Sequence, residues 1–424
     1  MSELIQPVKG MNDVLADQAP WWDQVESVAV ELFGGYGYQR VRVPVLERTE
    51  LFKRSIGELT DIVSKEMFTF DDYGDSLTLR PEATAGVVRA ALSNGLLHNQ
   101  QQKLWCSGPM FRREKPQKAR YRQFHQMSVE ALGFAEPEID AELIALSARL
   151  WSRLGIKSAK LELNTIGTAE SRQVYKQVLV DYFGKHRELL DEDSLRRLEG
   201  NPLRILDSKN PALRELIDAA PLLAGYLDAE SRAHFERVQA LLSDVGVAFT
   251  LNPRLVRGLD YYSRTVFEWL TDRLGAQGAV CSGGRYDGLV EQLGGRATPA
   301  VGWALGIERI VELMQAEGVG AVEAPPDAYL VAAGDAERRY AFKLAEELRG
   351  RLPKLRLSLG GPAAGFKAQL RKADKSGARV ALIVGEAELA AAKISFKPLR
   401  EDKPQELLTV EECVVLLRQT PVSA

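Results

Sequence analysis

The chain has 424 residues, of which 45% are hydrophobic and 27% are charged, and its formal net charge is −3. This length provides for two or three domains that each bury a core, and the composition is ordinary for a soluble globular protein. The chain as a whole carries no basic excess, so any binding of nucleic acid must use local positive patches.

The cysteines and histidines give no sign of a metal site or a disulfide framework. Cys106, Cys281 and Cys413 are far apart and odd in number, which predicts buried free thiols in a reducing compartment. The four histidines show no spacing typical of metal ligands. No apolar run approaches the length that crosses a bilayer, and the N-terminus has no apolar signal core. We therefore expect a cytoplasmic chain with no metal site and no membrane partner.

The first third of the chain predicts helices and strands in alternation. Apolar residues recur every three or four positions in the first helix, and an alternating run ended by proline predicts the first strand. A polar turn between two short strands indicates a hairpin. The expected helices are 19–33 and 83–92, and the expected strands are 38–44, 65–70 and 76–79.

Glu82 and Thr84 follow the strand-ending Pro81 and lie at the expected start of the second helix. A carboxylate and a hydroxyl at this place are suited to binding an ammonium group. The same residues are typical of a helix N-terminus, where the helix dipole favours an acid. The local sequence favours this structural reading.

A strongly basic stretch, residues 111–130, predicts two antiparallel strands joined by a basic loop. Residues two apart on a strand share a face, so Gln126, Ser128 and Glu130 are expected to point together. The stretch predicts a site that meets a polyanion on one side and a small polar molecule on the other, although a solvated basic hairpin has the same composition. Its basic residues, which surround Glu114, are Arg112, Arg113, Lys115, Lys118, Arg120 and Arg122.

The sequence pattern changes in the middle of the chain. After an expected helix over 139–154 and a strand over 160–164, strand patterns give way to charged helical stretches. Because sheet-like sequence resumes beyond them, residues 171–247 are interpreted as an inserted helical module. Strands are then expected over 249–255 and 266–269 and around Gly283 and Gly284.

Near residue 300 a strand of small residues runs into an expected helix, 307–316. Arg309 falls in the first turn of this helix, where the backbone is already electropositive. Taken alone, Arg309 is more typical of an ordinary surface arginine.

A linker at Pro325–Pro326 precedes a new pattern of alternating strands and helices. This alternation predicts a separate α/β domain. Its expected strands are 328–333, 355–359, 379–384 and 393–397, and its expected helices are 336–352, 365–376 and 410–418.

Arg112, Arg257 and Arg309 are too many cations for a single carboxylate. They suit a triphosphate, whose in-line displacement depends mainly on positioning and charge stabilisation. The sequence contains neither GxxxxGK[ST] nor a GxGxxG after a strand, so the common nucleotide-binding loops are absent. The acids and tyrosines suit a small molecule with an ammonium group and a second hydrogen-bonding group.

These stretches together resemble the class II aminoacyl-tRNA synthetases, and among them the bacterial type of the histidyl-tRNA synthetase family. The helix and strand that end at Pro44 are similar to class II motif 1. FRREKPQKARYRQFHQ resembles motif 2, and VGWALGIERI resembles motif 3, which ends in Arg309. LVRGLDYY and SGGRYDGL resemble two stretches particular to the histidine enzymes, and RPEAT fits as well. The resemblance covers essentially the whole chain.

The resemblance implies an α+β fold with an antiparallel class II synthetase catalytic sheet flanked by helices. The catalytic domain would cover 1–324, interrupted by the helical insertion 171–247. Residues 325–326 would link it to an α/β anticodon-binding domain over 327–424. A homodimer made through motif 1 is implied as well.

The implied reaction joins L-histidine to tRNA(His). ATP with Mg²⁺ is the implied co-substrate, it yields a histidyl-adenylate and pyrophosphate, and no prosthetic group is involved. The implied catalytic residues are Arg112, Arg257 and Arg309. The implied histidine-binding residues are Glu82, Ala83, Thr84, Arg112, Gln126, Glu130, Arg257, Tyr261, Tyr262 and Tyr286. The implied ATP-binding residues are Arg112, Glu114, Arg120, Phe124, Gly306 and Arg309.

Two alternatives remain open at this point. A catalytically silent, synthetase-like regulatory subunit of histidine biosynthesis would resemble the catalytic domain, but that family typically lacks the anticodon-binding domain and degrades the arginine set. A class II synthetase for glycine, proline or threonine is the other alternative, and the RGLDYY stretch argues against it.

Overall fold

The computed structural model describes residues 4–57, 60–116, 120–206, 208, 210–275, 278–321, 325–361 and 365–419. The chain divides into two compact units, Met1–Ala321 and Val322–Ala424, and each has a hydrophobic core of its own. Lys118, which belongs to the expected basic loop, lies outside the described residues.

The first unit is built on an eight-stranded sheet with the order β1-β5-β6-β11-β10-β9-β7-β8. Neighbouring strands run antiparallel, except that the outer pairs β1–β5 and β7–β8 are parallel. The antiparallel hairpin expected over 111–130 is confirmed as β5–β6, although β5 ends at Phe111, so nearly all of the first strand lies before that stretch. The strands are β1 (Gln39–Arg40), β5 (Gln102–Phe111), β6 (Gln123–Leu132), β7 (Lys160–Thr165), β8 (Phe249–Leu251), β9 (Ser263–Leu270), β10 (Ala279–Arg285) and β11 (Ala300–Gly306).

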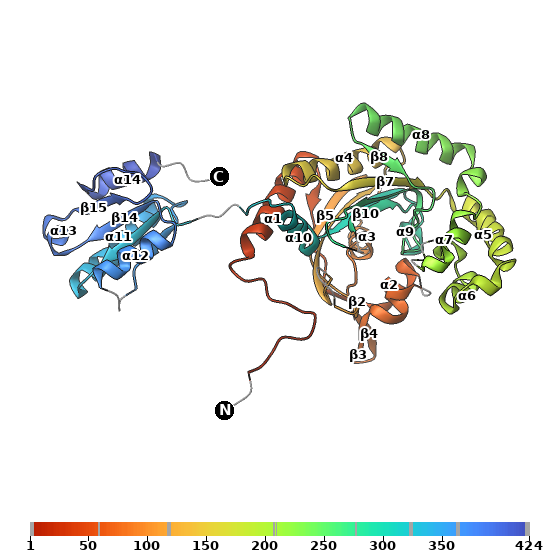
Figure 1. Ribbon diagram of the computed structural model, residues 1–424, viewed down its shortest axis with the longest axis horizontal. Helices are drawn as coiled ribbons and strands as arrows, with labels where there is room; N and C mark the ends of the chain where they lie inside the picture. The colour runs from red at the N-terminus through yellow and green to blue at the C-terminus, as the bar shows by residue number, and fades with distance from the viewer. Residues whose placement is uncertain are drawn as a thin grey trace. The chain divides into compact units, whose positions relative to one another are not determined.

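Four helices cover one face of this sheet (Figure 1). Every second side chain of the central strands points toward them and is buried, including Val129 and Ala131 of β6 and Val301 of β11. The intervening side chains are left for the opposite face, which carries the site described below. The covering helices are α1 (Ala19–Gly35), α4 (Pro137–Arg153), α8 (Ala229–Asp244) and α10 (Ile307–Ala316).

A small sheet, β2-β4-β3, stands beside the large one and contains the expected hairpin. The turn between β3 and β4 is Tyr73–Gly74, and both residues have positive φ, 46° and 92°, which glycine adopts without strain. The elements are β2 (Leu46–Arg48), α2 (Thr49–Ile56), η1 (Ile62–Glu66), β3 (Phe68–Asp72), β4 (Asp75–Leu79), α3 (Thr84–Ser93) and α9 (Leu289–Gln292).

A run of helices separates β7 from β8, and these two strands pair directly with Leu161 opposite Phe249. The helical segment therefore leaves and re-enters the sheet at adjacent strands. Its helices before α8 are α5 (Ala169–Gly184), η2 (Arg187–Leu189), α6 (Glu192–Glu199), η3 (Pro202–Ile205), η4 (Pro211–Leu213), α7 (Arg214–Asp218) and η5 (Leu223–Tyr226).

The second unit is a five-stranded sheet with the order β13-β12-β14-β15-β16 and helices against it. Strands β13, β12 and β14 are parallel, and β15 and β16 continue antiparallel. The elements are β12 (Ala328–Ala332), α11 (Asp335–Arg351), β13 (Leu357–Leu359), α12 (Phe366–Lys375), β14 (Val380–Val384), α13 (Glu386–Ala391), β15 (Ile394–Pro398), β16 (Glu406–Leu408) and α14 (Val410–Gln419).

Some expected elements differ from the structure. The strand expected over 38–44 is reduced to β1, because the carbonyls of Val43 and Pro44 accept hydrogen bonds from Arg80 Nη1, at 2.8 and 3.4 Å, rather than from a neighbouring strand. The strand expected over 249–255 ends at Leu251. Helix α13 and strand β16 were not expected, since elements this short hold too few side chains to show a period.

Candidate active site

A pocket of about 320 Å³ opens on the sheet face opposite the four covering helices. Segments far apart in the sequence meet there: the hairpin β5–β6, the start of α3, the loop before β9, strands β9 to β11 and the start of α10. The residues expected at the site that line this pocket are Glu82, Thr84, Arg112, Glu114, Arg120, Phe124, Gln126, Arg257, Tyr261, Tyr262, Tyr286, Gly306 and Arg309.

Strand β6 forms one wall, and its alternation matches the expectation. Phe124 and Gln126 line the pocket, whereas Ser128 and Glu130 follow on the same face but are fully buried. Across the ladder, Glu130 stands opposite Gly302 of β11. A Cβ atom at Gly302 would collide with the Glu130 carboxylate, so glycine at this position makes room for the acid.

Glu130 therefore lies behind the wall of the pocket, not on it. Its carboxylate accepts hydrogen bonds from the Thr84 hydroxyl, at 2.7 Å, and from the Tyr286 hydroxyl. Burial raises the pKa of Glu130 from 4.5 to about 8. The acid connects two hydroxyl groups that do face the pocket.

Glu82 combines the two readings that its sequence left open. Its carboxylate accepts hydrogen bonds from the backbone N–H groups of Thr84, at 2.6 Å, and Ala85, at 2.9 Å, and so caps α3. It also lines the pocket, and burial raises its pKa. Ala83, which was expected to bind histidine, is buried and does not line the pocket.

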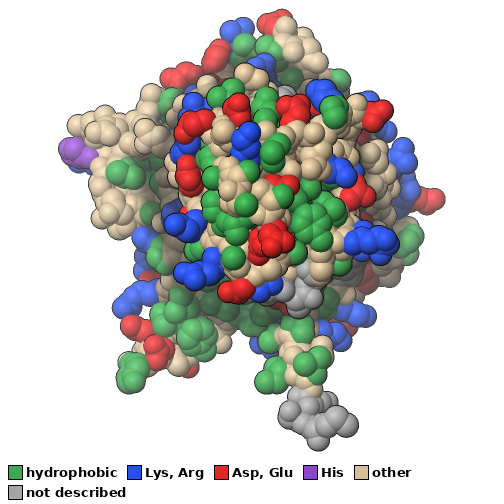
Figure 2. Space-filling view, turned by 90° about the vertical axis from the view of Figure 1, so that its left-hand side faces the viewer, with side chains coloured by type: hydrophobic (Ala, Val, Ile, Leu, Met, Phe, Trp, Pro, Cys, Tyr) green, Lys and Arg blue, Asp and Glu red, His purple; other side chains and the backbone are tan. Residues whose placement is uncertain are grey.

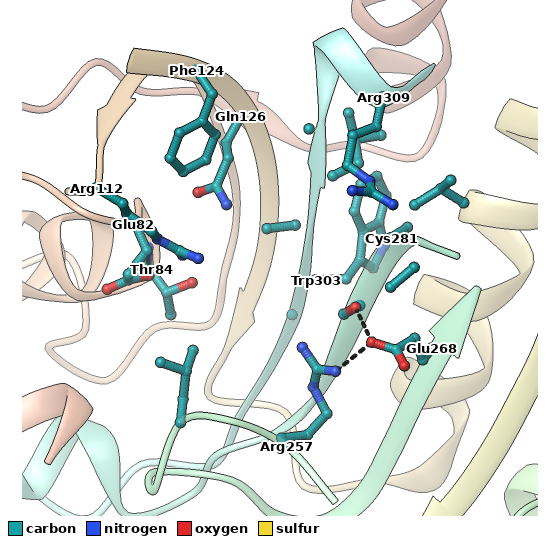
Figure 3. Close-up of a pocket in the computed structure, with 18 of the residues that line it drawn as sticks. Glu82, Thr84, Arg112, Phe124, Gln126, Arg257, Glu268, Cys281, Trp303 and Arg309 are labelled. Carbon is teal, nitrogen blue, oxygen red and sulfur yellow. Dashed lines mark hydrogen bonds and ion pairs between the residues drawn. The ribbon is translucent and has the colours of Figure 1, made fainter. Parts of the chain in front are cut away.

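Three arginines approach the pocket from different elements, and their guanidinium groups point inward (Figure 3). Arg112 follows β5, where its Nε donates to the Pro81 carbonyl at 2.9 Å and its guanidinium lies 5.3 Å from the centre of the Phe124 ring. Arg257 lies in the loop before β9. Arg309 lies in the first turn of α10, as expected.

Arg257 is held by an acid that was not anticipated. Its Nη1 donates to Glu268 Oε1 at 2.7 Å, and Ser282 Oγ donates to the same oxygen at 2.8 Å. Burial opposes the positive charge of Arg257, but the Glu268 carboxylate nearby outweighs this and raises its pKa. The sequence does contain a sign that Glu268 is unusual, because it is an acid between Phe267 and Trp269 in an apolar strand.

The basic loop contributes a further charged pair, an ion pair between Arg120 and Glu114. Burial, together with the positive charge of Arg120, lowers the pKa of Arg309. A second cation beside Arg309 in a partly enclosed space favours the entry of an anion.

Three tyrosines close the inner end of the pocket. The ring of Tyr261 lies 4.7 Å from that of Tyr262 and 5.4 Å from that of Tyr286, measured between centroids. Burial raises the pKa of all three, so their hydroxyl groups stay protonated and serve as neutral hydrogen-bond donors.

Sequence reasoning missed other residues on the wall, most of which lie inside or beside the motif stretches, because a motif does not show which of its neighbours face the pocket. They line the pocket through strand register or loop position, and they include Tyr121, Leu259, Glu268, Cys281, Ser282, Ala304 and Glu308. Cys106, Cys281 and Cys413 are buried free thiols, as expected. Within the described ranges, no group of three or more His, Cys, Asp or Glu side chains is arranged to hold a metal ion. Within the same ranges, no helix has the length and apolar character of a membrane span.

The chain matches known proteins along almost its whole length. A family model described as Histidyl-tRNA synthetase matches residues 10–310, and one described as Anticodon binding domain matches residues 327–420. Histidine–tRNA ligases of Hydrogenovibrio crunogenus and Halorhodospira halophila are each 54% identical to it, over 99% and 98% of this chain respectively and 98% of each relative.

Solved structures agree with this relationship. An apo histidyl-tRNA synthetase of S. aureus has a TM-score of 0.83 and 35% identity, with 98% of this chain and 100% of that chain covered. A Bacillus halodurans protein described as an ATP phosphoribosyltransferase regulatory subunit/histidyl-tRNA synthetase shares the fold, with a TM-score of 0.65 and 22% identity over 91% of this chain and 99% of that chain. By the first of the two family models and the high identity of its full-length relatives, the chain belongs to the histidyl-tRNA synthetase family of aminoacyl-tRNA ligases.

Proposed function

We propose that the pocket activates L-histidine with ATP and then passes the histidyl group to tRNA(His). A carboxylate oxygen of histidine attacks the α-phosphorus of ATP, and the bond to pyrophosphate breaks. The terminal ribose hydroxyl of the tRNA then attacks the carbonyl carbon of the adenylate, and AMP leaves. The observation that supports this most is the meeting of Arg112, Arg257 and Arg309 in one pocket with neutral tyrosines at its inner end.

The arginines supply the electrostatic part of the first step. Arg112 and Arg257 hold the histidine carboxylate and the α-phosphate while negative charge builds up, and Arg309 and Arg120 bind the outer phosphates. Fixed donors aimed at developing charge in a partly buried site typically contribute more than any other single effect. Bringing the two substrates together lowers the barrier further.

The adenine lies on the Phe124 ring, with Glu114 beside it. ATP enters as its Mg²⁺ complex, with the metal carried by the phosphates. The acids on the wall support this arrangement, because Glu82, Glu114 and Glu268 are already engaged by backbone N–H groups or arginines.

Histidine recognition depends on groups at the inner end of the pocket. Glu82, Thr84 and Gln126 receive the α-ammonium group, while Tyr262 and the Glu130 network meet the two imidazole nitrogens. Because Glu130 lies behind the wall, it acts on the ligand through the hydroxyl groups of Thr84 and Tyr286. A pocket built to satisfy both nitrogens leaves buried polar groups unpaired with any other amino acid, and such discrimination reaches roughly 10⁴-fold.

The second unit is proposed to read the anticodon, and the basic loop after Arg112 is proposed to approach the acceptor end of the tRNA. Positive and negative side chains are interspersed over the face drawn in Figure 2, so attraction of RNA relies on local groups of cations. The proposed group on α12 consists of Lys367, Arg371, Lys372 and Lys375, all exposed.

We also propose that the protein acts in the cytoplasm as a homodimer. The segment before α1 supports an interface with a second copy, because it exposes large apolar side chains. These are Leu4, Ile5, Val8 and Leu15.

Exchange of label between pyrophosphate and ATP tests the first step. Exchange is expected with histidine and with no other standard amino acid, since only histidine satisfies both polar groups of the inner pocket. Equal exchange with glycine or proline would contradict the proposed substrate. No exchange with any amino acid would favour the catalytically silent regulatory subunit instead.

A further inference from the structure

Glu268 lies on the pocket wall although its local sequence gives it no motif. It belongs to β9, where its neighbours Phe267 and Trp269 are buried against the covering helices, and the ladder places it opposite Ser282 of β10. An ionised carboxylate in the middle of a sheet is costly unless other groups pair with it. The partners of Glu268 therefore indicate what it does.

One oxygen of Glu268 joins three segments of the chain. Oε1 accepts from Arg257 Nη1 at 2.7 Å and from Ser282 Oγ at 2.8 Å, and both contacts are drawn in Figure 3. Arg257 lies in a loop without regular secondary structure, so no backbone ladder holds it in place. Its side chain is only 17% exposed, and that of Glu268 is 18% exposed. Solvent therefore screens this pair far less than an ion pair on the surface.

The contact leaves other donors of Arg257 for a ligand. An arginine has five N–H groups, and Glu268 accepts from Nη1. Nε of Arg257 is buried and has no hydrogen-bond partner in the described part of the chain. A buried donor without a partner costs free energy, and a hydrogen bond to an anionic ligand in the pocket would offset that cost.

We propose that Glu268 is a positioning residue for Arg257, and that Ser282 in turn orients Glu268. Holding one edge of the guanidinium directs its remaining donors toward the α-phosphate as the adenylate forms. The proposal rests on the function proposed above for Arg257. Its expected effect is on kcat more than on KM, because the donors gain most when charge builds up in the transition state.

The test measures histidine-dependent ATP–pyrophosphate exchange by the full-length protein and its variants. Glu268→Ala is expected to lower kcat by about 10- to 100-fold, the range that a displacement of about 1 Å can cause, with KM for histidine and ATP changed by less than about threefold. Glu268→Gln keeps an oxygen acceptor, so its kcat is expected to lie between that of Glu268→Ala and that of the wild type. Ser282→Ala is expected to cost about 3- to 10-fold, the value of one hydrogen bond.

A double-variant cycle separates positioning from general stability. If Glu268 acts through Arg257, the Arg257→Ala/Glu268→Ala protein is no slower than Arg257→Ala alone. Glu162 provides the matched control, because it stands opposite Glu268 in the ladder of β7 and β9 but lies outside the pocket. Its carboxylate accepts a hydrogen bond from Asn252. Glu162→Gln is expected to leave exchange unchanged.

Each contrary result has a distinct meaning. Additive losses in the double variant, or a Glu268→Ala protein as fast as or faster than the wild type, would overturn the positioning role, since Arg257 would then act without help from Glu268. A wild-type protein without histidine-dependent exchange would instead overturn the proposed function itself. Melting temperatures of all variants show whether a loss of rate reflects loss of the fold.

Discussion

Glu130 is a single side chain whose surroundings reverse its usual protonation. It has no exposed surface, and its two carboxylate oxygens meet the hydroxyl groups of Thr84 and Tyr286. Burial raises its pKa to about 8, so near neutral pH the carboxyl group keeps its proton for much of the time. A neutral acid both donates and accepts hydrogen bonds, which suits a network of hydroxyl groups.

This raised pKa predicts a loss of folding stability as pH rises, and Glu130→Gln is expected to remove that loss. An unfolded glutamate ionises near pH 4.5, whereas the folded one ionises near pH 8, so the unfolded chain binds fewer protons between these values. The contribution of Glu130 to stability therefore falls as pH rises through that window. As pH rises from about 5 to about 8, the free energy of unfolding of Glu130→Gln should increase relative to that of the wild type by roughly 1 kcal/mol or more.

Free energies of unfolding in denaturant at several pH values measure this difference. The exposed Glu236 of α8, changed to glutamine, controls for the loss of one acid. A difference between Glu130→Gln and wild type that stays constant with pH would contradict the assigned pKa. The same variant should raise KM for histidine more than KM for ATP.

At the scale of elements, a buried ion pair ties strand β10 to helix α4. Arg285 Nε donates to Asp140 Oδ2 at 3.1 Å, both side chains are fully buried, and Arg285 also donates to the carbonyl of Phe134 at 2.8 Å. His234 of α8 reaches the same carboxylate, with 3.5 Å between its Nε2 and Asp140 Oδ1. Tyr286 of the pocket directly follows Arg285, the last residue of β10, so this pair anchors the end of the strand from which Tyr286 extends.

Asp140→Ala is expected to destabilise the first unit by about 3–5 kcal/mol, because it removes the fully buried acid that pairs with Arg285 and leaves only the partly exposed Asp287 as an ionic partner. Glu138→Ala is the matched control. Glu138 pairs with Arg237 between the same helices α4 and α8, but both side chains are more than half exposed, at 53% and 54%. Its loss is expected to cost at most about 1 kcal/mol. Denaturant unfolding compares the two, and equal losses would contradict the importance of burial.

At the scale of the whole molecule, the two units have separate cores and are proposed to carry separate tasks. The pocket described above lies entirely in the first unit, Met1–Ala321. The exposed cations of α12 belong to the second. Changes on α12 should therefore affect the transfer to tRNA without affecting the activation of histidine.

Replacing Lys367, Arg371 and Lys375 by alanine should raise KM for tRNA by about tenfold at moderate salt, because each lost phosphate contact weakens binding and lowers its dependence on salt. ATP–pyrophosphate exchange should remain unchanged. Arg339 and Lys343, exposed cations of α11 in the same unit, provide a control pair. Equal effects of both sets on aminoacylation would show that net charge matters and that the α12 face does not.

The sequence by itself determined the large elements and the family. Long periodic helices such as α1 and α4, and the hairpin β5–β6, were predicted because their side chains repeat over enough turns or strand residues to be recognised. The arginine set and the motifs were also readable, since each occupies a short continuous stretch. These features depend on local order along the chain.

Only the tertiary structure decided which side chains share a space. It put Glu130 behind the wall, where Gly302 leaves room for it, and it placed Glu268 against Arg257 and Ser282. Arg80 also donates a hydrogen bond to the backbone carbonyl of Val43, where a longer strand was expected. Strand register, burial and the pairing of distant charges set these positions, and neighbours in the sequence do not encode them because the partners lie on other strands and loops.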